Sequence, residues 1–254
     1  MTIALIELVD YLDECLQPGQ FQDYCPNGLQ VEGTGRISRI ATGVTANQAL
    51  LDQAIAWGAD AILVHHGYFW KGEAPEVVGM KRRRLAALLA NDINLLAYHL
   101  PLDAHPELGN NACFGRLLGV TTIEPLASGA GEGLVCIGSL PRPLSVDDIR
   151  ASLSRETGRE PLYIGAGVEK PVQRIAWCTG AAQGYIDAAI AAGADLYVTG
   201  EVSEQTVHTA REEGIHFLAA GHHATERYGV QALGAHLADK FDLKHRFIDI
   251  DNPV

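Results

Sequence analysis

The sequence predicts an α/β fold built from two interlinked α/β lobes that arose by internal duplication. Two observations carry this prediction: a strand–helix–strand pattern that occurs twice, and an ungapped match between its two copies. Residues 39–66 align with residues 174–201 at a constant offset of 135, since 174 minus 39 is 135. The matched pairs are Arg39/Arg174, Ile40/Ile175, Ala41/Ala176, Gln48/Gln183, Asp52/Asp187, Ala54/Ala189, Ile55/Ile190, Gly58/Gly193, Ala59/Ala194 and Asp60/Asp195.

Each copy begins with an apolar run (37–44 and 172–178) that is followed by a helical pattern (46–57 and 182–192). The tripeptide Gly-Ala-Asp closes both helices, and glycine at a helix C-terminus adopts the left-handed conformation at little cost. The residues that follow are short, apolar and β-prone, which is typical of a buried strand. Each copy is therefore predicted to be a β-α-β unit.

The repeat continues less closely through a second helix (81–90 and 203–213) and a further strand (93–98 and 215–220). The strand of the first copy runs into His99-x-x-x-Asp103, and that of the second runs into His222-x-x-x-Glu226. If these stretches are helical, each imidazole shares a helix face with a carboxylate.

Outside the repeat, residues 3–16 form an amphipathic helical pattern, and Ser-Gly-Ala-Gly-Glu-Gly at 128–133 has loop composition. A strand is expected at 134–139. Ser145 with Asp148 three residues later predicts a capped helix that ends near Gly158. We expect the first lobe to span 1–125 and the second 126–254, with the C-terminal part packing back on the first.

Composition excludes several classes of protein. Hydrophobic residues make up 47% of the 254 and charged residues 20%, which argues against disorder and fibrous repeats. The net charge of −12 disfavours nucleic acid and anionic lipid as partners, and the basic run 81–84 is interpreted as a solvated or subunit-contacting face rather than a phosphate site. No apolar run approaches the roughly 20 residues that cross a bilayer. A soluble, cytoplasmic protein is expected.

Two familiar kinds of site are also disfavoured. The five cysteines are scattered without Cys-x-x-Cys spacing, so we expect reduced thiols rather than a disulfide framework or a zinc finger. Neither a Gly-x-Gly-x-x-Gly motif nor a Walker loop occurs, which sets aside dinucleotide and P-loop chemistry.

The chemistry-bearing residues gather where strand-like runs end. Imidazole and carboxylate donors from several strand ends can converge in an α/β fold, and this mixture suits divalent transition metals. Adjacent histidines diverge from one strand end, so they can serve two ions, and carboxylates can bridge metals about 3.5–4 Å apart. The predicted ligands are His65, His66, Asp103, His222 and Glu226.

Two further residues receive roles beside the ligands. His99 precedes Asp103 by four residues and could orient that carboxylate, ligate weakly or shuttle a proton. Glu201 occupies the position that corresponds to His66, where it could act as an acid, a base, an orienting group or merely a helix cap. The remaining histidines, at positions 105, 208, 216, 236 and 245, are expected to be hydrogen-bonded structural residues, and His223 is left open.

At these residues the chain resembles the NIF-three-like family, whose members are often labelled GTP cyclohydrolase I type 2 homologues. The resemblance implies a NIF-three-like fold, two divalent metal ions per chain held by the five ligands named above, and a ring-shaped homohexamer (a toroid) whose sites face an inner cavity. The motifs that carry it are 26–31 (Pro-Asn-Gly-Leu-Gln-Val), 43–45 (Gly-Val-Thr), 64–67 (Val-His-His-Gly), His99 with Asp103, 199–201 (Thr-Gly-Glu), and Gly221-His222 with Glu226.

The leading hypothesis is a dinuclear, divalent-metal-dependent hydrolase of a nucleotide or damaged-nucleotide-like substrate, with cyclohydrolase-type ring opening as one form of that reaction. The alternative is a non-catalytic, metal-binding, ring-shaped scaffold or interaction protein. A third reading is a metal-regulated interaction protein in transcription or the damage response. Iron, manganese, zinc and nickel all fit mixed histidine and carboxylate ligands.

Overall fold

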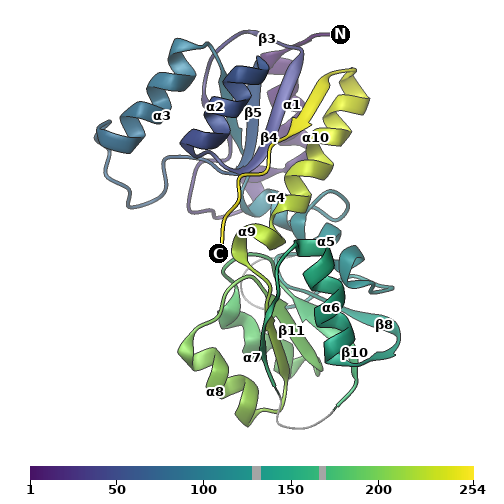
Figure 1. Ribbon diagram of the computed structural model, residues 1–254. Coiled ribbons are helices and arrows are strands. Elements are labelled where there is room, and N and C mark those ends of the chain that lie inside the picture. The colour runs from purple at the N-terminus through teal and green to yellow at the C-terminus, as the bar shows by residue number, and fades with distance from the viewer. Residues whose placement is uncertain (128–132, 166–169) are drawn as a thin grey trace. The chain divides into compact units, whose positions relative to one another are not determined.

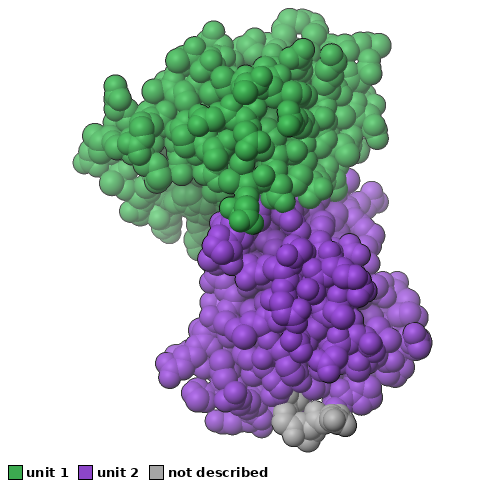
Figure 2. Space-filling view, in the orientation of Figure 1, with its two compact units in different colours: residues 1–102, 229–251 green, residues 103–228, 252–254 purple. Residues whose placement is uncertain are grey.

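The computed structural model describes residues 1–127, 133–165 and 170–254 (Figure 1). Contacts group the chain into two compact units: unit 1 comprises Met1–Leu102 with Gly229–Asp251, and unit 2 comprises Asp103–Tyr228 with Asn252–Val254 (Figure 2). This division differs from the expected boundary after residue 125. Residues 103–125 group with unit 2 because their helix contributes Phe114 and Leu118 to that unit's core. Most of the expected loop at 128–133 lies outside the described residues.

Unit 1 is built on a five-stranded sheet in the order β13-β4-β5-β6-β2. Strands β13, β4, β5 and β6 run parallel, and β2 pairs antiparallel with β6. The small β1-β3 ladder is antiparallel. The elements are β1 (Ile3–Ala4), α1 (Leu5–Leu16), η1 (Pro18–Gln20), β2 (Gly28–Val31), β3 (Arg36–Ile37), β4 (Arg39–Thr45), α2 (Gln48–Trp57), β5 (Ala61–His66), α3 (Gly79–Ala90), β6 (Asn94–Ala97) and β13 (Lys244–Phe247), with α4 (Leu100–Ala104) and α10 (Arg227–Phe241) at its two long crossovers.

Helices cover both faces of this sheet, with α2 and α3 on one side and α1 and α10 on the other (Figure 1). Along a strand, every second side chain points to the same face of the sheet, and residues paired across neighbouring strands share that face. Accordingly, Ala41, Ile62 and Leu95 pack in one cluster with Leu51 of α2 and Leu88 of α3. The three-layer arrangement leaves the carboxyl ends of β4, β5 and β6 at a common edge, where polar side chains can gather.

Unit 2 repeats this architecture around a six-stranded sheet in the order β7-β8-β10-β11-β12-β9. Its central strands β10, β11 and β12 are parallel, and β8 and β9 flank them antiparallel. The elements are α5 (Asn110–Leu118), β7 (Glu124–Pro125), β8 (Cys136–Leu144), α6 (Val146–Thr157), β9 (Leu162–Ile164), β10 (Val172–Trp177), η2 (Gln183–Tyr185), α7 (Ile186–Ala191), β11 (Leu196–Thr199), α8 (Glu204–Glu212), β12 (His216–Ala219) and α9 (His222–Thr225).

The two faces of this second sheet have separate cores. Helices α5 and α6 pack on one face around the fully buried Trp177, while α7 and α8 pack on the other around Tyr197 and Phe217. The expected helix cap is confirmed, since the Ser145 hydroxyl accepts a hydrogen bond from the Asp148 amide at the start of α6.

The duplication reappears as strand register. Ile40 pairs with Ala61 in unit 1, and Ile175 pairs with Leu196 in unit 2, so both partners are shifted by 135 residues. The aspartate of Gly-Ala-Asp has the same role in each copy. Asp60 accepts hydrogen bonds from the backbone amides of residues 38 and 39, and Asp195 from those of residues 173 and 174. The matched tripeptide is therefore a structural element that fixes where each first strand begins.

All five cysteines are free thiols, as expected. Across the described parts of the chain, no helix combines the length and apolar character that a membrane span requires.

Candidate metal centre

The adjacent histidines of unit 1 lie at the carboxyl end of β5. His65 is fully buried, and its Nδ1 lies 3.0 Å from the backbone carbonyl oxygen of Tyr98. His66 is half-buried, and its Nδ1 lies 3.1 Å from the Thr45 hydroxyl at the end of β4. The two ring centroids are 4.6 Å apart. Parallel pairing of β4, β5 and β6 thus supplies both the histidines and the groups that orient them.

His99 follows β6 and joins these two rings. Its ring centroid is 5.0 Å from that of His65 and 5.6 Å from that of His66. One ring nitrogen from each of the three histidines lies within 4.8 Å of the others, which is a spacing that can hold a metal ion. Unit 1 therefore brings together two of the three ligands predicted in the first copy and the predicted accessory histidine, whereas the third, Asp103, groups with unit 2.

The carboxylate of Asp23, which was not predicted from the sequence, forms a hydrogen bond with the ring of His99. Asp23 Oδ1 lies 2.7 Å from His99 Nδ1, and Asn27 Oδ1 accepts a hydrogen bond from the His99 backbone amide at 2.7 Å. Burial opposes ionisation of Asp23, but hydrogen bonds from His99 and Asn27 and the amide of Tyr24 outweigh it and lower the pKa to about 2. The only sequence signal was that the 26–31 motif contains Asn27, which lies 72 residues before His99.

In unit 2, His222 lies between two carboxylates. It begins α9 after Gly221, which has a φ of 98°. Its Nδ1 is 2.7 Å from Glu201 Oε1, and its Nε2 is 3.2 Å from Glu226 Oε2. Burial alone would lower the pKa of His222, but hydrogen bonds that its ring donates to Glu226 and Glu201, together with their negative charges, raise the pKa to about 9. Glu201 therefore orients His222 in this structure, while the roles of acid or base stay predictions.

Asp103 lies in α4 and is held by donors from two other segments. Its Oδ1 accepts hydrogen bonds from Asn110 Nδ2 at 2.9 Å and from the Thr179 hydroxyl at 3.4 Å. One of its carboxylate oxygens lies within 4.8 Å of a Glu226 carboxylate oxygen. Because both carboxylates are buried, they are pre-positioned side by side at the carboxyl ends of the unit 2 strands. Asn110 and Thr179 were not predicted, since they lie 69 residues apart in the sequence.

Close backbone approach explains two glycines beside these carboxylates. A Cβ on Gly180 would overlap Glu226 Oε1 and would lie 3.3 Å from His222 Nε2. A Cβ on Gly200 would lie 2.6 Å from both the Gly180 carbonyl oxygen and the His222 Cα. Only glycine leaves room for Glu226 to lie against the end of β10.

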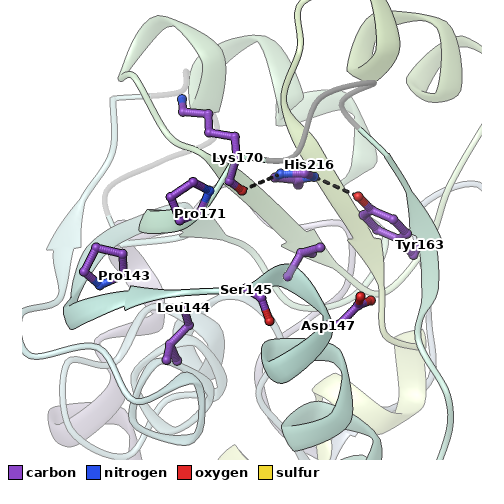
Figure 3. A pocket seen from close by; sticks show the side chains of 9 residues that line it. Pro143, Leu144, Ser145, Asp147, Tyr163, Lys170, Pro171 and His216 are labelled. Carbon is purple, nitrogen blue, oxygen red and sulfur yellow. Dashed lines mark hydrogen bonds between the residues drawn. The ribbon is translucent and has the colours of Figure 1, made fainter.

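A separate cavity of about 680 Å³ lies at the other end of the unit 2 sheet, where β12 begins (Figure 3). His216 is held there between the Tyr163 hydroxyl, 2.9 Å from Nδ1, and the Lys170 carbonyl oxygen, 3.0 Å from Nε2. Both ring nitrogens are thus engaged by the protein, in keeping with the structural role expected of this histidine. The lining residues are Pro143, Leu144, Ser145, Val146, Asp147, Tyr163, Lys170, Pro171 and His216.

The donor chemistry of the two clusters fits divalent metal ions. Imidazole nitrogens and carboxylate oxygens together suit iron, manganese, zinc and nickel, and metal-binding histidines usually donate their second ring N–H to a carboxylate or carbonyl. The described residues include groups of such donors that could bind a metal, among them His65, His66 and His99 of unit 1. The number and identity of the ions stay predictions.

Comparison with known proteins identifies the family. The family model described as Duf34/NIF3 (NGG1p interacting factor 3) matches residues 3–253. A Pseudomonas aeruginosa protein named GTP cyclohydrolase 1 type 2 homolog is 61% identical over 254 residues, which is 100% of both chains. An Escherichia coli protein of the same name is 55% identical over 248 residues, covering 98% of each.

Solved structures agree. The protein ybgI, described as of unknown function, has 54% sequence identity and a TM-score of 0.94 over 99% of this chain and 100% of that one. A Thermus thermophilus protein has 36% identity and a TM-score of 0.90 over the same shares. The expected α/β fold and the family resemblance are confirmed, and the chain belongs to the Duf34/NIF3 family.

Proposed function

We propose that this protein is a dinuclear, divalent-metal-dependent hydrolase that acts on a nucleotide or a damaged-nucleotide-like substrate. The proposed ligands are His65, His66, Asp103, His222 and Glu226. The observation that carries the proposal is the support behind these donors: His65, His66 and His222 each have Nδ1 hydrogen-bonded to a protein oxygen, and Asp103 is fixed by two further donors. Such outer hydrogen bonds are typical of metal ligands.

Two of the proposed carboxylate ligands lie, in the sequence, beside the points where the chain leaves and re-enters unit 1. Asp103 is the first residue of unit 2, immediately after Leu102 of unit 1. Glu226 is followed after two residues by Gly229, where the chain returns to unit 1.

Bound divalent ions would supply Lewis acidity and a water of lowered pKa, which is the chemistry that hydrolysis of a phosphate ester or a purine ring requires. The protein's own groups would do the rest. Asn110 and Thr179 hold Asp103 Oδ1 in place, and Glu201 fixes the ring of His222. Beside the ligands, Glu201 is the proposed proton-handling residue, and His99 would either handle a proton or ligate the metal weakly.

The substrate class follows from the names of the relatives and from charge. Curated relatives that span the whole chain are named GTP cyclohydrolase 1 type 2 homologs, which points to a nucleotide. A protein with a net charge of −12 would attract phosphate groups only where bound cations reverse the local charge. We also propose the homohexameric ring that the family resemblance implies, which light scattering can test.

The test combines metal content with turnover. We expect elemental mass spectrometry to find two ions per chain in the wild type and their loss in the double variant His66→Ala, Asp103→Asn. In a nucleotide hydrolysis screen with the native metal, Asp103→Asn should abolish turnover and retain the wild-type circular dichroism spectrum. His208→Ala, on the exposed side of α8, is the matched control and should leave both measurements unchanged.

Two outcomes would contradict the proposal. Full turnover of Asp103→Asn, or of chelated protein, would refute a metal-dependent reaction at these residues. Two bound ions with no turnover in a broad nucleotide screen would favour the alternative of a non-catalytic, metal-binding scaffold.

A further inference from the structure

We propose that His99 is a third metal-ligating imidazole of unit 1, and that Asp23 is the positioning residue that holds it in the ligating orientation. The inference deepens the proposed function and rests on the part of it that says the chain binds divalent metal ions. It adds to unit 1 a ligand that completes a three-imidazole site with His65 and His66.

Hydrogen-bond chemistry fixes the tautomers of two of the three rings. A backbone carbonyl oxygen can only accept, so His65 Nδ1–H donates to Tyr98 and the ring lone pair lies on Nε2. An ionised carboxylate can also only accept, so His99 Nδ1–H donates to Asp23 and its lone pair likewise lies on Nε2. Neutral imidazoles with Nε2 lone pairs are the commonest metal ligands among side chains.

Strand pairing brings the three rings together. His65 and His66 end β5, and His99 comes two residues after the end of β6. These strands are parallel neighbours, with Val64 paired to Ala97. The three ring nitrogens that lie within 4.8 Å of one another therefore arise from adjacent strand ends inside a single unit. A site of three imidazoles leaves coordination positions open for other ligands.

In the second copy of the duplication, the equivalent histidine, His222, also has its Nδ1 hydrogen-bonded to a carboxylate. His222 follows β12 as His99 follows β6, and each precedes a carboxylate by four residues. Its Nδ1 is 2.7 Å from Glu201, and the Nδ1 of His99 is also 2.7 Å from Asp23. The carboxylates come from unrelated segments of the two copies. His99 thus carries the same carboxylate support as a histidine already proposed as a ligand.

Asp23 is built to stay ionised and fixed. Its side chain is 4% exposed and accepts hydrogen bonds from Asn27 Nδ2 at 2.9 Å and from the Leu100 amide at 3.0 Å, besides His99. Cys25 offers a sulfur to the same cluster, but burial and then the charge of Asp23 raise the pKa of its thiol to about 12. Asp23 rather than Cys25 is the group that hydrogen-bonds with His99 Nδ1.

The test isolates unit 1 inside the full-length chain. The background variant carries Asp103→Asn, His222→Ala and Glu226→Gln, which removes the proposed donors of unit 2. We expect it to bind one Co²⁺ per chain and to quench the emission of Trp70, whose ring centroid is 5.1 Å from that of His99. Adding Trp70→Phe should remove that quenching without changing the Co²⁺ content, which assigns the signal to this site.

Substitutions of His99 and Asp23 then distinguish a metal ligand from a purely structural residue. In the background, His99→Gln should weaken Co²⁺ binding at least 100-fold, and Asp23→Asn should weaken it by about 10–100-fold, as loss of an orienting partner does. X-ray absorption should count three imidazole nitrogens on Co²⁺ in the background and two in His99→Gln at saturating metal. His208→Ala should change neither value, and circular dichroism checks that each variant is folded.

The results separate this inference from the proposed function. Unchanged Co²⁺ affinity and imidazole count in His99→Gln would overturn the inference, as would a folded background variant that binds no Co²⁺. A silent hydrolysis screen alongside His99-dependent Co²⁺ binding would instead refute the hydrolase and leave the three-imidazole site standing.

Discussion

Gly180 offers a sharp test of how the unit 2 donors are held, because one methyl group there should weaken metal binding at least tenfold with little effect on the fold. Gly180 follows β10 with a φ of +72°, and its missing Cβ makes room for Glu226 Oε1. In Gly180→Ala the carboxylate would have to retreat by about 1 Å, whereas metal–ligand distances tolerate only about 0.2 Å. The same methyl group would also crowd His222 Nε2 at 3.3 Å.

The cost to stability should be modest, because the atom that must move is the end of a flexible side chain. Alanine in the left-handed region costs about 1–2 kcal/mol, and about 2–4 °C of Tm accompanies each kcal/mol in a chain of this size. Gly214→Ala is the matched control, because Gly214 has a φ of +68° and a Cβ there would meet nothing within 4 Å. Gly214→Ala therefore introduces a similar left-handed backbone strain, but its methyl group overlaps no other atom.

The assay pairs Tm from thermal unfolding of the metal-free proteins with metal affinity from titration. Both variants should lose a similar few degrees in Tm, while only Gly180→Ala should lose at least tenfold in metal affinity, which is about 1.4 kcal/mol. Wild-type affinity in Gly180→Ala would refute the reasoning that Glu226 binds metal from the position it occupies here.

Three further outcomes are expected from features of unit 2. Burial opposes ionisation of Asp195, but hydrogen bonds from Lys170 and two backbone amides outweigh it and lower the pKa. This carboxylate therefore stabilises the fold above its unfolded pKa of about 4, and that contribution is lost as the pH falls through the lower folded value. Urea unfolding should show that Asp195→Asn costs about 1–3 kcal/mol at pH 7 and progressively less as the pH falls below 4; an equal cost at pH 7 and pH 2 would contradict the linkage. Ser145→Ala should cost about 1 kcal/mol by the same assay, because it removes the cap of α6, and Ser139→Ala, which is not a cap, serves as its comparison. Phe114→Ala should cost about 3–5 kcal/mol, and a cost below 1 kcal/mol would show that α5 does not hold the core of unit 2.

Local pattern was enough to predict most of the repeated frame. The match between residues 39–66 and 174–201 foretold two β-α-β units, and the observed strand pairs at Ile40 and Ile175 follow the same offset. Glycine and cap signals placed helix ends well, as at Ser145 and Gly158. These successes share a cause, because each depends on residues close together in the chain.

Long-range contacts account for what the sequence did not reveal. Nothing near Asp23 in the sequence indicates that it hydrogen-bonds with His99, which lies 76 residues later. The partnership between Glu201 and His222 was likewise hidden, since the alignment of the copies indicated only that Glu201 replaces His66. The grouping of residues 103–125 with unit 2 has the same origin, because α5 joins the core around Trp177 through contacts that no local pattern records.

The order in which the units occur along the chain has a consequence for synthesis. Apart from three terminal residues, unit 2 is one continuous insertion of residues 103–228, whereas unit 1 is split around it. During translation the insertion can therefore complete its core while unit 1 still lacks α10 and β13, the strand that pairs with β4. The edge of β4 stays open until residues 244–247 emerge from the ribosome, so truncation just before them should leave a nascent chain with an unpaired, aggregation-prone strand beside a finished second unit.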